Sequence, residues 1–304
     1  MGRKKSNQAL TMSYAIKSFV GFLEGTGKAK HTISSYRSDL NAFQGFLEQH
    51  LSSDRVVLSD VTSHDLDRYF DYLKSKGDRT NTRRRKLLTV RRLFRYLNVR
   101  KKTPQNLAQK LPAPYKVERV PKVTSVVKLR KNIQLLPEET EIDFRNKVLF
   151  WTLLETGCQV SELTRLRFLN WTKSHQGKKR WVEFEGKQNR KVQVSDELFD
   201  AVIELKGKKD KKSSLFLGFN KFGPLGSSIS SRGVELLVKS YAGYFEEKQI
   251  TPRMLRHCAV LNWYKQGVSR DEIQRRLGLK TGYSFRVYEP LFKKADKTAS
   301  ISTH

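Results

Sequence analysis

Five short segments hold most of the side chains that could carry chemistry, and arginine, lysine, histidine and tyrosine stand out among them. In chain order they are Glu155 to Leu163 (ETGCQVSEL), Gly186 to Lys191 (GKQNRK), Thr251 to His257 (TPRMLRH), Leu277 to Leu279 (LGL) and the single residue Tyr288. The sequence has no glycine loop of the kind that cradles phosphates, no cluster with metal-ligand spacing and no serine nucleophile elbow. We therefore expect neither a metal nor another cofactor.

The overall charge indicates the class of partner. The 304 residues include 60 Lys+Arg against 30 Asp+Glu, a formal net charge of +30, while 38% hydrophobic residues suffice for a folded core. A folded protein this basic most often binds a polyanion, and nucleic acid is the first candidate.

Other features of the sequence concern the compartment. The longest apolar run, Val148 to Leu154, is too short to cross a bilayer, and the basic start is not followed by the apolar stretch of a secretory signal. The cysteines, Cys158 and Cys258, fit a reduced compartment. We expect no membrane contact, and a cytoplasmic, nucleoid-associated protein.

The first hundred residues have the periodicity of helices. Apolar residues recur at helical spacing from Ile16, from Ile33 with Thr32 as a possible N-cap, from Ser63 and after Thr80. The fourth of these helices carries a row of positive side chains with almost no acidic residues between them. The row consists of Arg83, Arg84, Arg85, Lys86, Arg91, Arg92 and Arg95. Such a row can simply be a helix face exposed to solvent. Because almost all of its charges are positive and repel one another, however, the row favours a helix face that contacts DNA phosphates, which supply the opposite charge.

The pattern changes after residue 98. Four of the eight prolines fall between residues 98 and 123, which predicts an extended, stiff basic linker. An apolar helix follows from Phe144 to Thr156, and alternation on both sides of a turn at 186–189 predicts a hairpin. Further helices are expected from Ser231, Pro252 and Ser269. Val268 to Gly278 also fits half of a helix-turn-helix.

In their order and spacing, the five segments resemble the tyrosine recombinase (phage integrase, Xer-like) family. The stretch Thr32 to Leu40 (TISSYRSDL) is similar to the second-helix signature of that family, so the resemblance covers nearly the whole chain. It implies a mainly α fold with a small antiparallel β-sheet, arranged as a two-domain C-shaped clamp on double-stranded DNA. The expected divisions are a basic tail (1–9), a helical core-binding domain (10–105), a linker (106–121), a catalytic-type domain (122–295) and a polar tail (296–304).

The resemblance also implies a reaction. In this family a tyrosine attacks a DNA phosphodiester without a metal and forms a 3′-phosphotyrosyl link, while cationic residues stabilise the charge on the phosphate oxygens. Tyr288 falls at the nucleophile position, Arg256 at the second clamp arginine and His257 beside it. Lys187 lies in the hairpin turn where the general acid belongs, and Glu162 matches the acidic residue that supports the first arginine.

Three positions depart from the family pattern. Gln159 stands where the first clamp arginine is expected, Arg253 replaces a histidine, and Leu279 replaces a histidine or tryptophan. An amide brings no charge and cannot grip two acceptors in a fork, so Gln159 is the most serious change. Arg165, six residues further on, lies around the far side of the same helix and is a poor substitute.

Two functions remain open. One is a site-specific recombinase or integrase with impaired cleavage, and the other is a degenerate relative that binds DNA as a regulatory or architectural protein. Either could act as a homo- or hetero-oligomer on DNA. The lysine-rich run from Lys206 to Lys212 is expected to be a solvated loop rather than a nuclear-import signal. The end from Lys293 to His304 is expected to fray.

Overall fold

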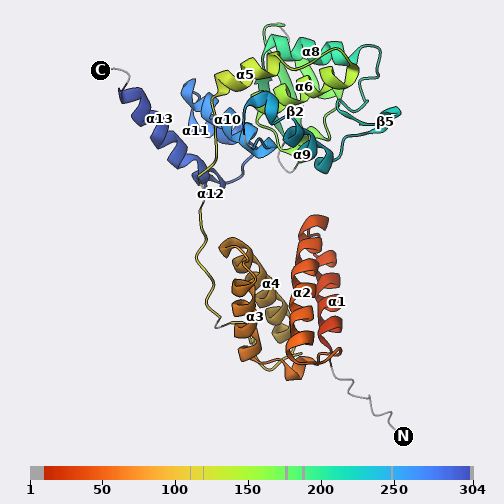
Figure 1. Ribbon diagram of the computed structural model, residues 1–304, viewed down its shortest axis with the longest axis vertical. Helices are drawn as coiled ribbons and strands as arrows, with labels where there is room; N and C mark the ends of the chain where they lie inside the picture. The colour runs from red at the N-terminus through yellow and green to blue at the C-terminus, as the bar shows by residue number, and fades with distance from the viewer. Residues whose placement is uncertain are drawn as a thin grey trace. The chain divides into compact units, whose positions relative to one another are not determined.

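The computed structural model divides into two compact units, Met1–Glu118 and Arg119–His304, each with its own hydrophobic core (Figure 1). The structure describes residues 10–109, 111–118, 120–174, 177–186, 189–247 and 249–301. Helices predominate in these ranges, and the strands form two small antiparallel sheets. The predicted fold class, mainly α with a small antiparallel sheet, is confirmed.

Unit 1 is built from helices whose apolar faces meet. They are α1 (Met12–Gly25), α2 (Lys30–His50), α3 (Ser63–Ser75) and α4 (Thr80–Val99), with a 3-10 turn at Leu58–Asp60. Phe43 lies fully buried at the centre, with its ring centroid 4.9 Å from that of Tyr69 and 6.4 Å from that of Phe94. The prediction that Thr32 caps α2 is wrong. The helix already begins at Lys30, and the Thr32 N–H donates to the carbonyl of Ala29 within the first turn.

The segment after α4 has an extended backbone, and it packs against the helices of unit 1. Ala108 and Leu111 are buried in the core of this unit. Three side chains of α4 also bind the backbone of the segment. Arg91 donates to Ala108 O (3.1 Å), Arg84 donates to Pro114 O (2.6 Å), and Asn81 pairs with both backbone groups of Val117 (2.9 and 3.0 Å). The compact unit therefore ends at Glu118, within the stretch 106–121 that the prolines predict to be a linker.

Unit 2 surrounds its core with helices and a three-stranded sheet. Its helices are α5 (Val126–Gln134), α6 (Glu141–Thr156), α7 (Val160–Leu163), α8 (Asp196–Lys206), α9 (Ser231–Ser240), α10 (Pro252–Lys265), α11 (Arg270–Arg276), α12 (Gly282–Phe285) and α13 (Glu289–Ile301). Short 3-10 turns lie at Phe168–Asn170, Gly243–Phe245 and Arg286–Tyr288. The strands are β1 (Trp171–Lys173), β2 (Arg180–Phe184), β3 (Arg190–Val194), β4 (Leu217–Asn220) and β5 (Gly223–Ser228).

Two features of unit 2 position the candidate site. The predicted hairpin is present, because β2 pairs with β3 in antiparallel register and Phe184 lies opposite Arg190 next to the turn. Helix α6 ends at Thr156, and its C-cap Gly157, with a φ of 55°, lies against Trp263 and Ala259 of α10. A Cβ at Gly157 would lie 3.2 Å from the Trp263 ring, so this close approach depends on glycine.

The C-terminal part corrects one prediction. The polar composition after Lys293 predicts a frayed end, but α13 continues through Ile301, so the prediction is wrong for residues 293–301. The start of the helix is held by Phe292, which is fully buried and stacks on Tyr264 at 4.1 Å. The Tyr264 hydroxyl also donates to the carboxylate of Asp296. Residues 302–304 lie outside the described ranges.

Candidate phosphate site

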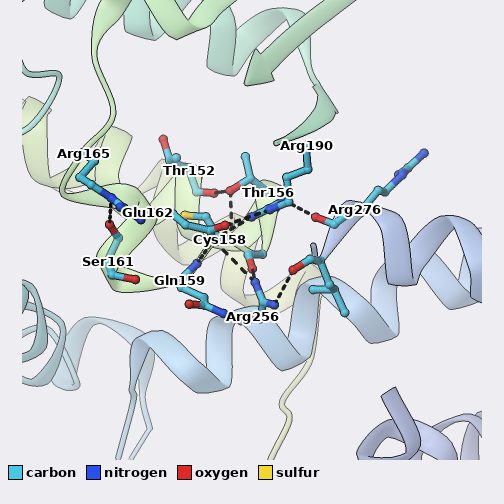
Figure 2. Close-up of polar contacts among 12 residues, drawn as sticks. Thr152, Thr156, Cys158, Gln159, Ser161, Glu162, Arg165, Arg190, Arg256 and Arg276 are labelled. Carbon is cyan, nitrogen blue, oxygen red and sulfur yellow. Dashed lines mark hydrogen bonds and ion pairs between the residues drawn. The ribbon is translucent and has the colours of Figure 1, made fainter. Parts of the chain in front are cut away.

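Glu162 is the centre of a polar cluster at the start of α7 (Figure 2). Its carboxylate accepts a hydrogen bond from Arg190 Nε at 3.0 Å, another from Arg190 Nη2 at 2.9 Å, and one from the Gln159 backbone N–H at 2.7 Å. Burial alone would raise the pKa of Glu162, but the bonds and charge of Arg190, with the Gln159 N–H and the charge of Arg256, lower it below its ordinary value. Glu162 is therefore ionised at neutral pH.

Arg190 is a site residue that the sequence motifs did not single out. Its side chain is only 3% exposed, its guanidinium lies 4.1 Å from the Phe184 ring centroid, and Nη1 donates to the carbonyl of Arg276 at the end of α11. Alternation along β3 was the available signal, because Arg190 shares a face with the buried Val192 and Val194. A buried arginine requires a partner, and Glu162 is that partner.

Arg256, predicted as the second clamp arginine, lies beside this pair on α10. It is 8% exposed, and its guanidinium donates to the carbonyl of Gly157 and, at 3.0 Å, to that of Leu277. Its Nη1 also lies 4.0 Å from Glu162 Oε2. Burial and the like charge of Arg190 lower the pKa of Arg256, while Glu162 opposes this change. A guanidinium has five N–H donors, so these two carbonyl bonds leave capacity for a phosphate.

His257 and Tyr288 form the second polar contact of the site. His257 Nδ1 lies 3.2 Å from the Tyr288 hydroxyl, and both residues are buried. Burial, together with the positive charges of Arg253 and Arg256, lowers the pKa of His257 to about 4. Burial raises the pKa of the Tyr288 phenol, although Arg256 and Arg253 pull it down. At neutral pH the two groups are therefore an uncharged imidazole and an uncharged phenol.

The remaining predicted residues are placed differently. Arg253 and Gln159 are exposed, on α10 and at the start of α7 respectively, and Leu279 is half-buried after α11. Lys187, predicted as the general acid, lies outside the described residues. The Arg165 side chain donates to the carbonyl of Ser161, and its contact with Glu162 is between backbone groups, in keeping with the expectation that it does not replace the missing arginine (Figure 2).

The basic row on α4 divides into two groups. Four members bind other parts of unit 1. Arg84 and Arg91 hold the segment after α4, Lys86 lies 2.7 Å from Asp78, and Arg85 pairs with the buried Asp39 and donates to Ser35. The other three members are Arg92 and Arg95, which are exposed, and Arg83, which is half-buried. Arg92 lies over the Tyr36 ring at 5.3 Å.

Three members of the row, Arg84, Arg85 and Arg92, also line a groove between α2 and α4, with a volume of about 690 Å³. The prediction that this row contacts DNA stays a prediction.

No helix in the ranges that the structure describes is long and apolar enough to cross a membrane. Within the same ranges, no group of three or more His, Cys, Asp or Glu is arranged so that it could hold a metal ion.

The fold and this site have counterparts in known proteins. The pattern of the phage integrase N-terminal SAM-like domain matches residues 16–101, and that of the phage integrase family matches residues 127–294. The second match alone covers more than half of the chain. The chain belongs to the phage integrase family, and the resemblance expected from its motifs is confirmed.

Relatives with similar sequences are Xer-type tyrosine recombinases. The chain is 26% identical over 273 residues to tyrosine recombinase XerC of Natranaerobius thermophilus, covering 86% of this chain and 88% of that protein. It is 26% identical over 285 residues to XerD of Brucella suis, covering 88% and 89% of the two chains.

Solved structures share the fold at lower identity. The XerH site-specific recombinase bound to its palindromic difH substrate superposes with a TM-score of 0.74 at 16% identity, covering 98% of this chain and 86% of that one. A lambda integrase fragment, solved as a dimer bound to a core site, gives a TM-score of 0.69 at 14% identity, covering 90% and 96%. The fold is therefore that of tyrosine recombinases.

Proposed function

We propose that the protein is a DNA-binding, site-specific recombinase of the tyrosine type, and that its cleavage step is slow. The observation that carries this proposal is the convergence of Tyr288, His257 and Arg256 in one buried site of a chain that belongs to the phage integrase family. These are the positions at which the family resemblance expects the nucleophile, the second clamp arginine and the histidine that follows it.

In the proposed reaction, the Tyr288 oxygen attacks the phosphorus of a DNA phosphodiester. A 3′-phosphotyrosyl bond forms, the bond to the 5′ oxygen breaks, and that oxygen takes a proton, for which Lys187 is the proposed donor. The phenol must lose its own proton. An ordinary phenol, with a pKa about three units above neutral, costs roughly 4 kcal/mol to ionise. Burial of Tyr288 increases this cost. His257 Nδ1, 3.2 Å away, can accept the proton, but its lowered pKa of about 4 makes it a weak base, which is a further reason for slow cleavage.

Several features support slow rather than fast cleavage. Arg256 already donates to two backbone carbonyls, Tyr288 is only 4% exposed, and Gln159 contributes no charge to the phosphate. Loss of a catalytic arginine typically costs about 10³–10⁵ in rate. The same observations favour the alternative, in which the chain binds DNA as a regulatory or architectural protein and does not cut it.

The test begins with selection of bound duplexes from a random pool, followed by suicide substrates that carry a nick at successive positions of the selected site. We expect a covalent protein–DNA adduct, separated on a denaturing gel, that is absent in Tyr288→Phe. Tyr264→Phe is the matched control, because it removes a hydroxyl from the same unit outside the site. No adduct at any nick, with an unchanged footprint in Tyr288→Phe, would support the alternative.

The Gln159→Arg variant tests the proposed cause of slow cleavage. The new guanidinium can stabilise phosphate charge, so the adduct should form faster, by up to the roughly 10³–10⁵ attributed to a catalytic arginine. Gln159→Lys provides the control, because it restores charge without a two-pronged donor and should gain less. An unchanged rate in both variants would mean that the defect lies at another position.

We also propose that the protein acts on nucleoid DNA as an oligomer. The related lambda integrase structures are described as a dimer on a core site and a tetramer on a Holliday junction. The number of copies bound to the selected duplex can be measured by analytical ultracentrifugation.

A further inference from the structure

Arg190 and Arg256 connect the same two segments of unit 2. Arg256 binds the carbonyls of Gly157 and Leu277, while Arg190 binds Glu162 and the carbonyl of Arg276. Both guanidinium groups thus link the segment from Gly157 to Glu162 with the residues at the end of α11 (Figure 2). Their like charges repel each other, and the charge of Arg190 is among the causes that lower the pKa of Arg256.

Glu162 lies between the two guanidinium groups but is unevenly shared. Its Oε2 is 2.9 Å from Arg190 Nη2 and 4.0 Å from Arg256 Nη1, and its Oε1 is bound by Arg190 Nε. A bidentate pair of this kind is the strongest contact that a carboxylate makes with an arginine. Two arginines and one carboxylate leave a net charge of +1, and Gln159 adds nothing to it.

We propose that Arg190 is a positioning residue of the phosphate site: by binding both oxygens of Glu162, it keeps this carboxylate from pairing with Arg256 and leaves the charge of Arg256 available to a phosphate. Arg190 thereby makes up part of the positive charge that is missing at Gln159. The inference rests on the proposed phosphate site, and it adds a residue that the family resemblance did not supply.

Arg190 acts through Glu162 rather than by touching the phosphate. Its side chain is 3% exposed, one face of its guanidinium lies against Phe184, and its third nitrogen is used by the Arg276 carbonyl. Gly278 permits this burial, because a Cβ there would come within 2.9 Å of Arg190 Cδ.

His257 offers a readout that requires no DNA and no cleavage. It follows Arg256 on α10, and the charged or titratable groups that act on it are Arg253 and Arg256 from its own helix and Tyr288 from the turn before α13. The positive charge of Arg256 lowers the pKa of His257. If Glu162 pairs with Arg256, that charge is partly neutralised and the pKa of His257 rises.

The experiment follows the pKa of His257 in the full chain by NMR, with ¹³C-labelled histidine and His257→Gln to assign the signal. We expect Arg190→Met to raise this pKa by about one unit. The double variant Arg190→Met with Glu162→Gln should return it to the wild-type value or below, because no carboxylate remains to pair with Arg256. Arg165→Met, which removes a neighbouring guanidinium without a bond to Glu162, should leave it unchanged.

The double variant separates this proposal from a purely structural role. If loss of Arg190 only loosens the site, exposure raises the pKa of His257 in the single and the double variant alike, and the proposal is overturned. An unchanged pKa in Arg190→Met overturns it as well. If Arg190→Met does not fold, Arg190→Lys retains charge but not the bidentate grip, and a smaller rise is expected; no rise counts against the proposal. Failure of DNA cleavage would not alter these results, so the two proposals can fail separately.

Discussion

Gly278 shows how one missing side chain shapes the site. It has a φ of 65° and lies against Arg190, and a Cβ there would come within 2.9 Å of Arg190 Cδ. Gly278→Ala should lower the free energy of unfolding for two reasons. The left-handed backbone conformation costs an alanine about 1–2 kcal/mol, and the displacement of Arg190 by the new Cβ adds a further loss. Gly267, with a φ of 78° and open space within 4 Å of where a Cβ would lie, is the matched control. Urea unfolding should give a larger loss for Gly278→Ala than for Gly267→Ala; equal losses would contradict the contact with Arg190.

His257 gives a prediction for pH. Its pKa in the folded protein is about 4, below the ordinary value of 6.5, so the unfolded chain binds its proton more readily. The stability that this neutral imidazole contributes is complete above pH 6.5 and is lost as the pH falls towards 4, by about 3 kcal/mol in all. His257→Gln should therefore flatten the decline in unfolding free energy over this range, measured by urea unfolding at several pH values. A decline as steep as in the wild type would contradict the pKa shift.

The sequence could supply the residue types of the site but not all of its contacts. Tyr288, Arg256 and His257 were found from motifs, and the structure brings them together. Arg190 was missed because its partners, Glu162 and Arg276, are 28 and 86 residues away along the chain. The one indication in the sequence was the alternation along β3, which places Arg190 on the same face as the apolar Val192 and Val194. A strand of five residues next to a charged turn gives little evidence that an arginine at its first position is buried.

At the scale of elements, α4 has two kinds of basic residue. Both Arg85 and Arg95 are exposed, but they differ in what they contact. Arg85 pairs with the buried carboxylate of Asp39, which is 3% exposed, whereas Arg95 belongs to the group that we predict to contact DNA. Arg85→Ala should lower the free energy of unfolding by about 1–3 kcal/mol, because the buried Asp39 carboxylate then loses its ion pair with Arg85. Arg95→Ala should leave stability unchanged and, if it removes a phosphate contact, reduce the slope of log affinity against log salt by about one.

Chemical unfolding and DNA titrations at several salt concentrations distinguish the two effects. A loss of stability in Arg95→Ala equal to that in Arg85→Ala would contradict the division of the row. An unchanged salt slope in Arg95→Ala would remove this residue from the predicted DNA contacts.

Elements with a clear apolar period, a recognisable cap or an alternating hairpin pattern were predictable, and several others were not. Helices α1 to α4, α6 and α10 follow from apolar spacing and from caps such as Thr251. The sequence pattern did not identify α5, α8, β1 or the pairing of β4 with β5, a hairpin that contains three of the glycines. The end of α13 was missed because its support, Tyr264 with Phe292 and Asp296, is a tertiary contact rather than a local pattern.

At the scale of the molecule, the packing of residues 106–118 predicts where unit 1 can be separated. A fragment 1–105 lacks Ala108 and Leu111, which are 0% and 5% exposed in the core of this unit. The fragment 1–118 should be more stable by about 2–4 kcal/mol, from the apolar area that these residues bury. Urea unfolding of both fragments measures the difference, with a 1–118 fragment carrying Leu111→Ala expected between them. Equal stability of the two lengths would show that the segment contributes nothing.

The same packing changes how the two units cooperate. Unit 1 holds the chain to Glu118, and Val123 already packs on the core of unit 2, so only a few residues remain to join them. Five steps of fully extended chain span at most about 18 Å. If both units bind the same duplex, as the proposed function requires, this short joint keeps the second unit within a small volume around the DNA that the first unit has bound. The local concentration of the second unit is then in the millimolar range or above, and each weak, salt-sensitive contact adds to a much slower release of the whole protein.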